Sequence, residues 1–381
     1  MKLGITSNIY LPFSCGVSNV IKETVNFLIN KHNYDITIFT PNWLNSSSKE
    51  DQRNLHICRF PYKHIIQNYA ISPKLFNSLK KQKFDIIHSH GFGYFPAFAG
   101  FLASKLNNTP HLLTPHYHPP IYGLFRKSLF WLYNLTQGLP MLRFSEKILP
   151  ITEYEKKLLC NIGGTPKNMQ ISPNMINTNL IKFSNKILPI KTKEKIILRI
   201  GKFSREKGGD IAFNIAKNIV KNRNDISFIF VGSGGEFEVD IKRQAAKFDK
   251  NTFIFLDKGI STEELVNLYS VADVVISTSI YEAFCIVLAE AMSCKTPVVA
   301  TKVGGVPDVV TDTKSGFLVE YGNWKKFEEK ICLLLDDMKL NRKFGRYGRK
   351  YVVENFEREK ILNNLINIYE SILNSKNEIY K

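Results

Sequence analysis

The sequence predicts an α/β protein made of two doubly wound parallel-sheet units. Its 381 residues suffice for about two domains that each bury a core. Short apolar segments alternate with helical patterns in both halves, as expected for helices packed on parallel sheets. A stretch without periodicity separates the halves. The predicted organisation is a first domain over 1–185, a linker over 186–194, a second domain over 195–358 and a C-terminal helix over 359–381.

Each half contains five apolar segments that the pattern predicts as buried strands, because strands covered on both faces are apolar throughout. Those of the first half are Lys2–Ser7, Asp35–Thr40, Phe84–Ser89, His111–Thr114 and Lys147–Thr152. Those of the second half are Lys195–Ile200, Ser227–Val231, Thr252–Leu256, Asp273–Ser277 and Pro297–Ala300. From Asn341 onwards the chain becomes helical and charged.

The composition, with 44% hydrophobic and 23% charged residues, is typical of a soluble protein. No run of about 18 uncharged apolar residues predicts a membrane span. The N-terminus enters a strand pattern without a signal-peptide core, so we expect a cytoplasmic protein. Six cysteines without a CxxC pair are expected to be small buried residues in a reducing compartment.

Positive charge is concentrated in the first half. Residues 1–185 contain 20 Lys and Arg against 8 Asp and Glu, whereas the other 196 residues contain 32 against 26. A basic face attracts anionic lipid or a phosphorylated acceptor. The alternative is a solvated surface that reflects a Lys- and Asn-rich composition. The aromatic segment 121–133, with its basic pair Arg126 and Lys127, fits either a peripheral position in a membrane interface or the protein core.

Two carboxylates eight positions apart, Glu282 and Glu290, stand on either side of a predicted entry into a helix. The free N–H groups of a helix N-terminus bind phosphate, and here they come from Phe284, Cys285 and Ile286. We expect Glu282 to accept hydrogen bonds from sugar hydroxyls and Glu290 to reach a ribose. Glutamate is common, so a pair at this spacing also occurs by chance.

Three cations lie in a predicted loop between a strand and a helix: Lys202, Arg205 and Lys207. Cations stabilise the charge that develops on a leaving diphosphate. A glycine turn containing Gly232 follows the next strand and permits close backbone approach to a ligand.

The run Tyr281–Asp308, with Gly304-Gly305-Val306-Pro307, resembles the donor-site signature of retaining glycosyltransferases of family 4, also called group 1. The resemblance implies the GT-B fold, in which two Rossmann-like domains face each other across a cleft and the C-terminal helix returns to the first domain. Lys207 matches the family's diphosphate lysine, whereas Lys202 stands where arginine is usual. Cys285 stands where glycine is frequent.

In the first half, Gly16 resembles the second glycine of the family's Gly-Gly loop, whose first glycine is here Cys15. The segment Leu113-Thr114-Pro115-His116 resembles the element whose histidine faces the donor sugar. The resemblance therefore implies that Glu282, His116 and Lys207 are the catalytic residues. The implied donor-binding residues are Gly16, Lys202, Arg205, Lys207, Gly232, Phe284, Cys285, Ile286 and Glu290.

The implied reaction transfers a hexose or N-acetylhexosamine from a UDP- or GDP-sugar to a hydroxyl of a glycan or lipid-linked acceptor, as in polysaccharide biosynthesis. Configuration is retained, and the leaving phosphate takes the acceptor proton on the same face. No Asp-x-Asp occurs in the chain, so we expect neither a metal nor another cofactor. The expected partners are the nucleotide sugar, the acceptor and an anionic membrane surface, but not nucleic acid.

Three alternatives remain at this stage. A GT-B epimerase or a sucrose-type synthase would share the donor site. A basic nucleic-acid-binding protein would explain the net charge of +18, although no recognition motif is present. A metalloenzyme would use the pairs His88/His90 and His116/His118, since residues i and i+2 of a strand share a face.

Overall fold

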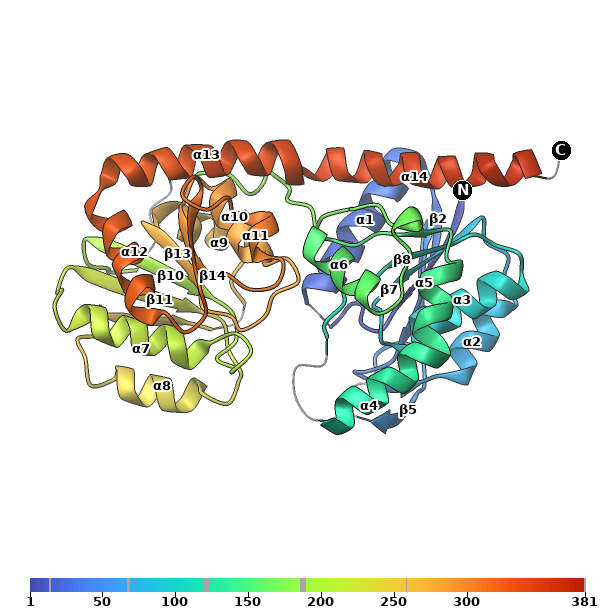
Figure 1. Cartoon of the computed structure of the whole chain (residues 1–381), viewed down its shortest axis with the longest axis horizontal. Helices are drawn as coiled ribbons and strands as arrows, with labels where there is room; N and C mark the ends of the chain where they lie inside the picture. Colours follow the sequence, from blue (N-terminus) through green and yellow to red (C-terminus); the bar gives the residue numbers. More distant parts are fainter. Residues whose placement is uncertain (14, 67–68, 120–123, 186–189, 258, 380–381) are drawn as a thin grey trace. The chain divides into compact units, whose positions relative to one another are not determined.

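The computed structural model describes residues 1–379 apart from 14, 67–68, 120–123, 186–189 and 258. The chain forms two compact units, one of Met1–Asn174 with Lys360–Lys381 and one of Met175–Glu359. Each unit is a parallel-stranded sheet between helices (Figure 1), which confirms the predicted α/β class. The predicted aromatic segment and linker lie partly outside the described residues, at 121–123 and 186–189.

The division between the units falls earlier than the predicted boundary at residue 185. Ile176 forms a β-bridge with Glu357, and its N–H donates to the Phe356 carbonyl over 2.7 Å. The carbonyl of Ile181 accepts a hydrogen bond from Arg349 over 3.1 Å. These contacts tie residues after 174 to the second unit, and a local lack of periodicity in the sequence does not reveal them.

The first unit contains a seven-stranded sheet in the order β3-β4-β2-β1-β7-β8-β9. Its neighbouring strands pair in parallel except for the edge strand β3. A separate antiparallel hairpin joins β5 and β6. The bounds are β1 Lys2–Ser7, β2 Asp35–Pro41, β3 Lys49–Gln52, β4 Leu55–Phe60, β5 Lys63–Ile66, β6 Tyr69–Ile71, β7 Ile86–His90, β8 His111–Thr114 and β9 Lys147–Ile148.

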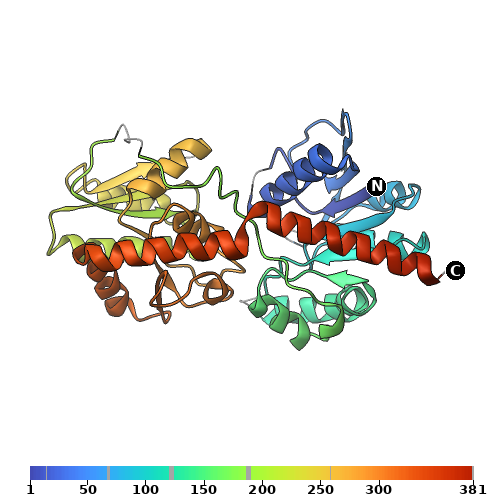
Figure 2. The ribbon, with the colours of Figure 1, turned by 90° about the horizontal axis from the view of Figure 1, so that it is seen from above.

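Helices cover both faces of this sheet. Ile87 of β7 packs in one cluster with residues of α2 and α3, whereas the next side chain, His88, hydrogen-bonds Tyr369 of α14. Because successive strand residues point to opposite faces, α14 lies on the face opposite α2 and α3, along the first unit (Figure 2). The bounds are α1 Gly16–His32, α2 Pro73–Lys80, α3 Phe95–Leu106, α4 Leu124–Tyr133, the π-helix η1 Asn134–Gly138, α5 Leu139–Phe144, α6 Glu153–Asn161, the 3₁₀ turn η2 Pro166–Asn168 and α14 Arg358–Ile379.

The second unit contains a six-stranded sheet in the order β12-β11-β10-β13-β14-β15, with parallel pairing throughout. The strands are β10 Lys195–Ile200, β11 Ile226–Val231, β12 Phe253–Leu256, β13 Val274–Ser277, β14 Val298–Thr301 and β15 Gly316–Val319. The helices are α7 Gly209–Val220, α8 Glu238–Ala245, α9 Thr262–Val271, α10 Ile286–Ser293, α11 Val306–Val309, α12 Trp324–Asp336 and α13 Met338–Phe356.

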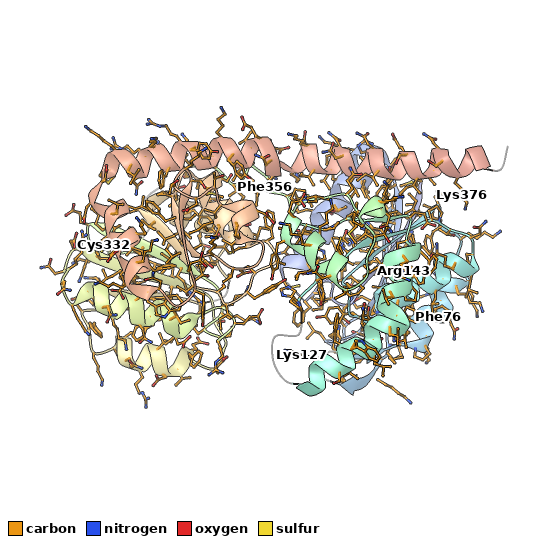
Figure 3. The ribbon with its side chains drawn as sticks, viewed as in Figure 1. Phe76, Lys127, Arg143, Cys332, Phe356 and Lys376 are labelled. Carbon is orange, nitrogen blue, oxygen red and sulfur yellow. The ribbon has the colours of Figure 1, made fainter. Side chains whose placement is uncertain are left out.

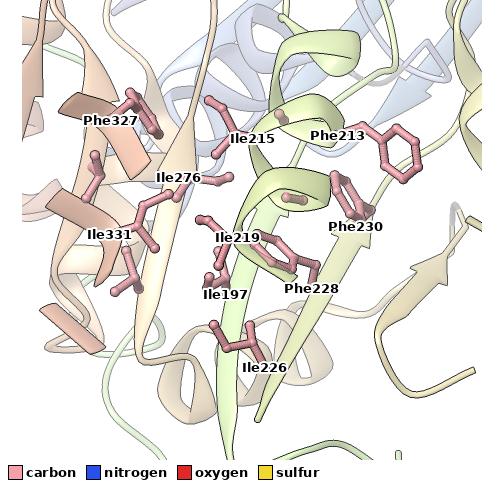
Figure 4. Close-up of a cluster of buried hydrophobic side chains, with 14 of the residues drawn as sticks. Ile197, Phe213, Ile215, Ile219, Ile226, Phe228, Phe230, Ile276, Phe327 and Ile331 are labelled. Carbon is pink, nitrogen blue, oxygen red and sulfur yellow. The ribbon is translucent and has the colours of Figure 1, made fainter. Parts of the chain in front are cut away.

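A large core cluster of the second unit lies between its sheet and α7, α8 and α12. Ile197, Phe228, Phe230 and Ile276 come from three neighbouring strands and meet the apolar side of α7 and α12 (Figure 4). Burial of such side chains contributes roughly 1.5–3 kcal/mol each. This core holds the strands whose carboxyl ends carry the candidate site.

The sequence analysis missed several strands and gave the wrong end for one that it predicted. The predicted strand Lys147–Thr152 ends at Ile148 in the structure, because Pro150 cannot continue a ladder. Strand β3 has the sequence Lys-Glu-Asp-Gln and is mostly exposed. It has no apolar pattern that would predict a strand, and pairing with β4 at the edge of the sheet stabilises it. Strands β4, β5, β6 and β15 were also not predicted.

Both sheets reverse their winding beside their first strand. In chain order the strands of each unit run 3-2-1-4-5-6, once the edge strand β3 is set aside. In such sheets ligands bind outside the carboxyl ends of the strands, at the point where the strand order reverses. That point lies between β1 and β7 in the first unit and between β10 and β13 in the second.

Candidate active site

A pocket of about 120 Å³ lies at the reversal point of the second unit. It is formed by the ends of β10 and β13, the loop after β10 and the start of α10. The residues that line it are Arg199, Ile200, Gly201, Lys207, Ile276, Ser277, Thr278, Ser279, Glu282, Cys285, Ile286 and Val287. Four of the predicted site residues therefore meet here: Lys207, Glu282, Cys285 and Ile286.

The charged centre of this pocket is an ion pair between Lys207 and Glu282. Lys207 Nζ lies 2.8 Å from Glu282 Oε1, and the Ser279 hydroxyl donates to the same oxygen over 2.8 Å. The carboxylate is mostly buried. Its charge raises the pKa of Lys207 against the opposing effect of burial, so the lysine stays charged at neutral pH.

The sequence analysis overlooked Arg199, which is a lining residue of the pocket and is 2% exposed. Its guanidinium donates to the carbonyl of Gly201, to that of Lys202 over 2.6 Å and to that of Lys207 over 3.0 Å. Burial lowers its pKa to about 10, so it remains a cation at neutral pH. Arg199 therefore fixes the loop that carries both lysines. The only signal in the sequence is a single charge inside the apolar strand Lys195–Ile200.

Cys285 caps the start of α10 with φ of +69°, a left-handed conformation that costs a residue with a Cβ roughly 1–2 kcal/mol. A glycine would adopt it freely. The Cys285 thiol lies 3.8 Å from Ser277 Oγ, and burial raises its pKa. It is therefore a neutral thiol in the wall of the pocket.

Phe284 packs its ring edge-to-face on Phe356, with the ring centroids 5.1 Å apart. Its side chain thus belongs to the packing beneath the site, where Phe356 ends α13 (Figure 3). A glycine close by, Gly304, has φ of +53°, and a Cβ there would lie 2.0 Å from the Glu282 carbonyl oxygen. The Gly305 N–H donates to that same carbonyl over 2.8 Å. The Gly-Gly turn thereby fixes the backbone of Glu282.

Glu290 lies further along α10 and outside the lining of the pocket. The Tyr269 hydroxyl donates to Glu290 Oε2 over 2.7 Å. Burial raises the pKa of Glu290 to about 7, and the Tyr269 hydrogen bond opposes this rise. Its carboxyl group therefore titrates in the physiological range.

The remaining predicted residues of the second unit surround the pocket without lining it. Lys202 and Arg205 are exposed on the loop after β10, and the Arg205 N–H donates to Glu236 over 2.8 Å. Gly232 has φ of +121°, and a Cβ there would lie 2.8 Å from the Gly201 carbonyl oxygen. Gly232 thus lets the turn after β11 pack against the loop after β10.

In the first unit, buried imidazoles lie near the carboxyl ends of β7 and β8. His88 contacts Tyr369 Oη over 2.7 Å and Thr114 Oγ1 over 2.8 Å. His90 Nδ1 lies 3.3 Å from His116 Nε2. Burial lowers the pKa of His88 to about 3 and that of His116 to about 4, and it places the pKa of His90 well below its usual value. The three rings are therefore neutral at neutral pH.

His116 has φ of +46°, an uncommon left-handed conformation that is often found at functional sites. The buried carboxylate of Glu155 accepts the N–H groups of Tyr117 and Ile151 and so holds the loop just after His116. His118 is exposed, and Gly16 begins α1 with open space where a Cβ would stand. His116 and Gly16 belong to the first unit, so their contact with a donor stays a prediction.

The part of the chain that the structure describes contains no group of three or more His, Cys, Asp or Glu side chains arranged to hold a metal ion. Among its described helices, none is long and apolar enough to cross a membrane. The charged side chains that line the pocket are Lys207, Arg199 and Glu282.

Two doubly wound units, one of which carries a cation–carboxylate pocket at the start of a helix, define the GT-B class of fold. Solved structures agree. Sucrose-phosphate synthase from Thermosynechococcus elongatus has a TM-score of 0.79 at 20% identity, covering 98% of this chain and 99% of the other. Anabaena HepE, in complex with UDP-glucose, has a TM-score of 0.73 at 18% identity and covers 97% and 100%.

Two family models match consecutive parts of the sequence. Residues 15–180 match Glycosyltransferase Family 4, and residues 181–351 match Glycosyl transferases group 1. An uncharacterized glycosyltransferase of Methanocaldococcus jannaschii is 24% identical over 98% of this chain and 99% of its own length. The chain belongs to glycosyltransferase family 4, the group 1 glycosyl transferases, and is an enzyme of the hexosyltransferase class.

Proposed function

We propose that this enzyme transfers a hexose or N-acetylhexosamine from a UDP- or GDP-sugar to a hydroxyl of a glycan or lipid-linked acceptor, with retention of configuration. The observation that carries the proposal is the contact of 2.8 Å between Lys207 and Glu282. This contact supports the proposal, in which Lys207 is the cation for the diphosphate and Glu282 is the carboxylate for the sugar hydroxyls. The UDP-glucose bound by the Anabaena neighbour supports a nucleotide-sugar donor.

In this proposal the donor diphosphate lies against Lys207 and the first turn of α10. A helix N-terminus carries unpaired N–H groups and a partial positive charge, and Ile286 and Val287 of this turn line the pocket. When the diphosphate binds, Lys207 exchanges part of its contact with Glu282 for the phosphate. The carboxylate is then free to accept hydrogen bonds from the sugar.

The step needs no nucleophile from the protein. The bond from the anomeric carbon to the diphosphate oxygen breaks, and the acceptor oxygen bonds to the same face of that carbon. The acceptor proton passes to the leaving phosphate oxygen. Lys207 and the α10 N–H groups stabilise the charge that develops on the diphosphate, which is the role of a metal ion in metal-dependent transferases. We therefore propose a metal-independent reaction.

The test begins with a panel of UDP- and GDP-sugars, whose binding is measured by thermal shift and calorimetry with and without a chelator. The best donor is then incubated with candidate acceptors, and the anomeric configuration of the product is read by NMR. We expect binding in the presence of chelator, weaker binding by Lys207→Ala and a retained configuration.

Each alternative outcome has a distinct meaning. An inverted product would contradict the same-face mechanism, and loss of activity with chelator would contradict metal independence. An epimerised nucleotide sugar without transfer would identify an epimerase, whereas a disaccharide formed from a free sugar would identify a sucrose-type synthase. Failure of every nucleotide sugar to bind would overturn the donor proposal.

A further inference from the structure

The region between Asp85 and Glu146 contains no carboxylate side chain. Its 60 residues include Lys105, Arg126, Lys127 and Arg143 but neither Asp nor Glu. This region belongs to the more basic unit, in which 22 Lys and Arg stand against 10 Asp and Glu, compared with 30 against 24 in the other unit. The positive charge of this segment is therefore not matched by carboxylates of the same segment, although Lys105 at its edge pairs with Glu146 over 3.0 Å.

The helical segment α4–η1 in this region has a well-anchored inner side. Phe130 and Tyr133 pack on the cluster that contains Phe92, Tyr117 and Met141, and the Tyr133 hydroxyl accepts the Gly93 N–H over 2.9 Å. One turn further, Asn134 donates to the Ile162 carbonyl over 2.9 Å, and Gln137 accepts from Tyr69 over 2.6 Å. The inner positions 130, 133, 134 and 137 have helical spacing, so the orientation of the segment is fixed.

The outer side of the same segment is apolar where a solvated helix would be polar. Trp131 is 65% exposed, and Leu132 and Leu135 are each 51% exposed. These positions are neighbours on a helix because they are three and four residues apart. Exposed cations stand towards both ends, with Lys127 on α4 and Arg143 on α5 (Figure 3). We call this surface, made of Lys127, Trp131, Leu132, Leu135 and Arg143, the α4 face.

We propose that the α4 face binds an anionic lipid bilayer by inserting Trp131, Leu132 and Leu135 at the level of the headgroups. Tryptophan and leucine between cations are the side chains that hold a helix in a membrane interface. Charge selects anionic lipid, because Lys and Arg side chains near such a surface are attracted to its negative headgroups. A soluble polyanion would match the cations but would leave the three large apolar side chains in water.

The segment lies on the membrane rather than across it, since no helix among the described residues meets the length and hydropathy of a span. Membrane binding adds a partner surface to the proposed function. It rests on that function only in that a transferase with a lipid-linked acceptor would use such a surface. A lipid-linked acceptor would reside in the same surface. Lipid binding needs no nucleotide sugar, so its failure is distinguishable from failure of the transferase proposal.

The test is flotation of the full chain with vesicles of phosphatidylcholine, alone or with about one third phosphatidylglycerol. We expect the parent to float with the anionic vesicles, to stay mostly unbound with the neutral ones and to dissociate as salt is raised. The double variant Trp131→Ser, Leu135→Ser should bind the anionic vesicles at least about tenfold more weakly. Its matched control is Val239→Ser, which changes an 81% exposed side chain of the other unit and should bind like the parent.

A second arm reads the insertion directly. The chain contains three tryptophans, Trp43, Trp131 and Trp324, and burial of an indole in lipid shifts its emission to the blue. Trp131→Phe should keep vesicle binding and lose the shift, whereas Trp324→Phe should keep both. Lys127→Gln with Arg143→Gln should weaken binding, unlike the exposed pair Arg342→Gln with Lys343→Gln on α13.

Two results would overturn the proposal: a parent that stays at the bottom of the gradient with anionic vesicles, or a Trp131→Ser, Leu135→Ser variant that floats like the parent. Unchanged melting temperatures establish that the variants are folded, as expected for exposed positions. If the serine variant loses fold, Trp131→Phe still decides, because a shift that persists without Trp131 contradicts its insertion.

Discussion

The two units share a strand order but carry opposite chemistry at the same place. In the second unit the reversal point holds charged groups, with Lys207, Arg199 and Glu282 around one pocket. In the first unit the strand ends at this point carry His90 and, just after the next strand, His116, which are buried and neutral. The fold thus defines where a ligand binds, and the loop residues define what can bind there.

This difference predicts which unit holds the phosphates. Cations and a helix start stabilise a diphosphate, whereas neutral imidazoles form hydrogen bonds without net charge and suit sugar or acceptor hydroxyls. The charged pocket should therefore be sensitive to the loss of single charges, and the histidine chain should be sensitive to shape and tautomer. The predictions below test this contrast in order of decreasing effect.

The largest effect is expected for Glu282→Ala, which should reduce kcat by roughly 10²–10³. The substitution removes the carboxylate proposed to accept hydrogen bonds from the donor sugar hydroxyls. It also removes the ion-pair partner that lies 2.8 Å from Lys207. Steady-state transfer rates measure the change. A matched control is Glu320→Ala, which breaks an exposed Lys–Glu pair of the same length and should leave kcat unchanged. A normal kcat in Glu282→Ala would contradict the assignment.

Substitution of the two lysines in the loop after β10, Lys207 and Lys202, should affect donor turnover to different extents. Lys207→Ala should lower kcat/KM for the donor by about 100-fold, since Lys207 lines the pocket and pairs with Glu282. Lys202 is exposed and is not among the residues that line the pocket. Lys202→Ala should therefore lower kcat/KM for the donor by about tenfold or less. The reverse order would mean that the diphosphate lies on the outer part of the loop.

Glu290 should make donor binding depend on pH. Its pKa is raised to about 7, so its carboxyl group is ionised above pH 7 and protonated below. In the predicted role, the ionised form accepts a hydrogen bond from the donor ribose. Donor affinity should therefore fall as the pH drops below about 7. Glu290→Gln should weaken binding by roughly 1.5–3 kcal/mol and flatten this profile. Calorimetry between pH 6 and 8 measures both changes, and an unchanged profile in Glu290→Gln would refute the role.

The same raised pKa affects stability. The folded protein keeps a proton on Glu290 that the unfolded chain releases between about pH 4.5 and 7. The unfolded state binds fewer protons in that window, so this group makes the free energy of unfolding decrease as the pH rises through it. Denaturant titrations of the parent and Glu290→Gln should therefore differ in slope against pH.

Arg199→Lys should lower kcat/KM by about tenfold, since one ammonium cannot span the three carbonyls that the guanidinium binds. In Arg199→Ala, methylguanidinium should restore part of the lost activity, and methylammonium or urea should not. Arg223→Ala is the control, because Arg223 pairs with Asp225 and Asp336 away from the pocket. If urea restored as much activity as methylguanidinium, the activity lost in Arg199→Ala would come from the space left by the side chain and not from its charge.

The smallest effect concerns the histidines. Because the pKa of His116 is near 4 and that of His90 is lower still, the first unit should add no pH dependence to kcat between pH 6 and 8. His116→Asn keeps a residue that tolerates left-handed backbone, and it should lower kcat without changing the shape of the pH profile. An inflection of kcat near pH 6.5 that is present in the parent and absent in His116→Asn would mean that the histidine pair becomes charged there.

The sequence predicted best where burial and spacing carry the signal. The central strands of both sheets were recognised because their inner residues are mostly apolar or small, as in β10 and β1. Glu282 and Lys207 were placed in one site although 75 positions separate them. The edge strand β3 was missed because its stability comes from a neighbouring strand rather than from its own side chains.

Other site features depend on contacts that no local pattern encodes. Arg199 acts through carbonyl groups of its own loop, and the sequence alone gives no sign of where a guanidinium points. The Tyr269 contact that steadies Glu290 links two helices. The sequence analysis predicted a backbone contact for Phe284. The structure adds that its ring packs on Phe356, a contact that the sequence pattern does not indicate.

The docking of α14 on the first unit has a consequence for synthesis. The residues that contact His88 and Asn108, namely Tyr369 and Lys376, are translated after the whole of the second unit. The second unit is contiguous in sequence and can close while translation continues. Translation of the first unit begins earlier, but this unit is completed only after the second one, and a ribosome that stalls before residue 360 would release a chain whose first unit still lacks α14.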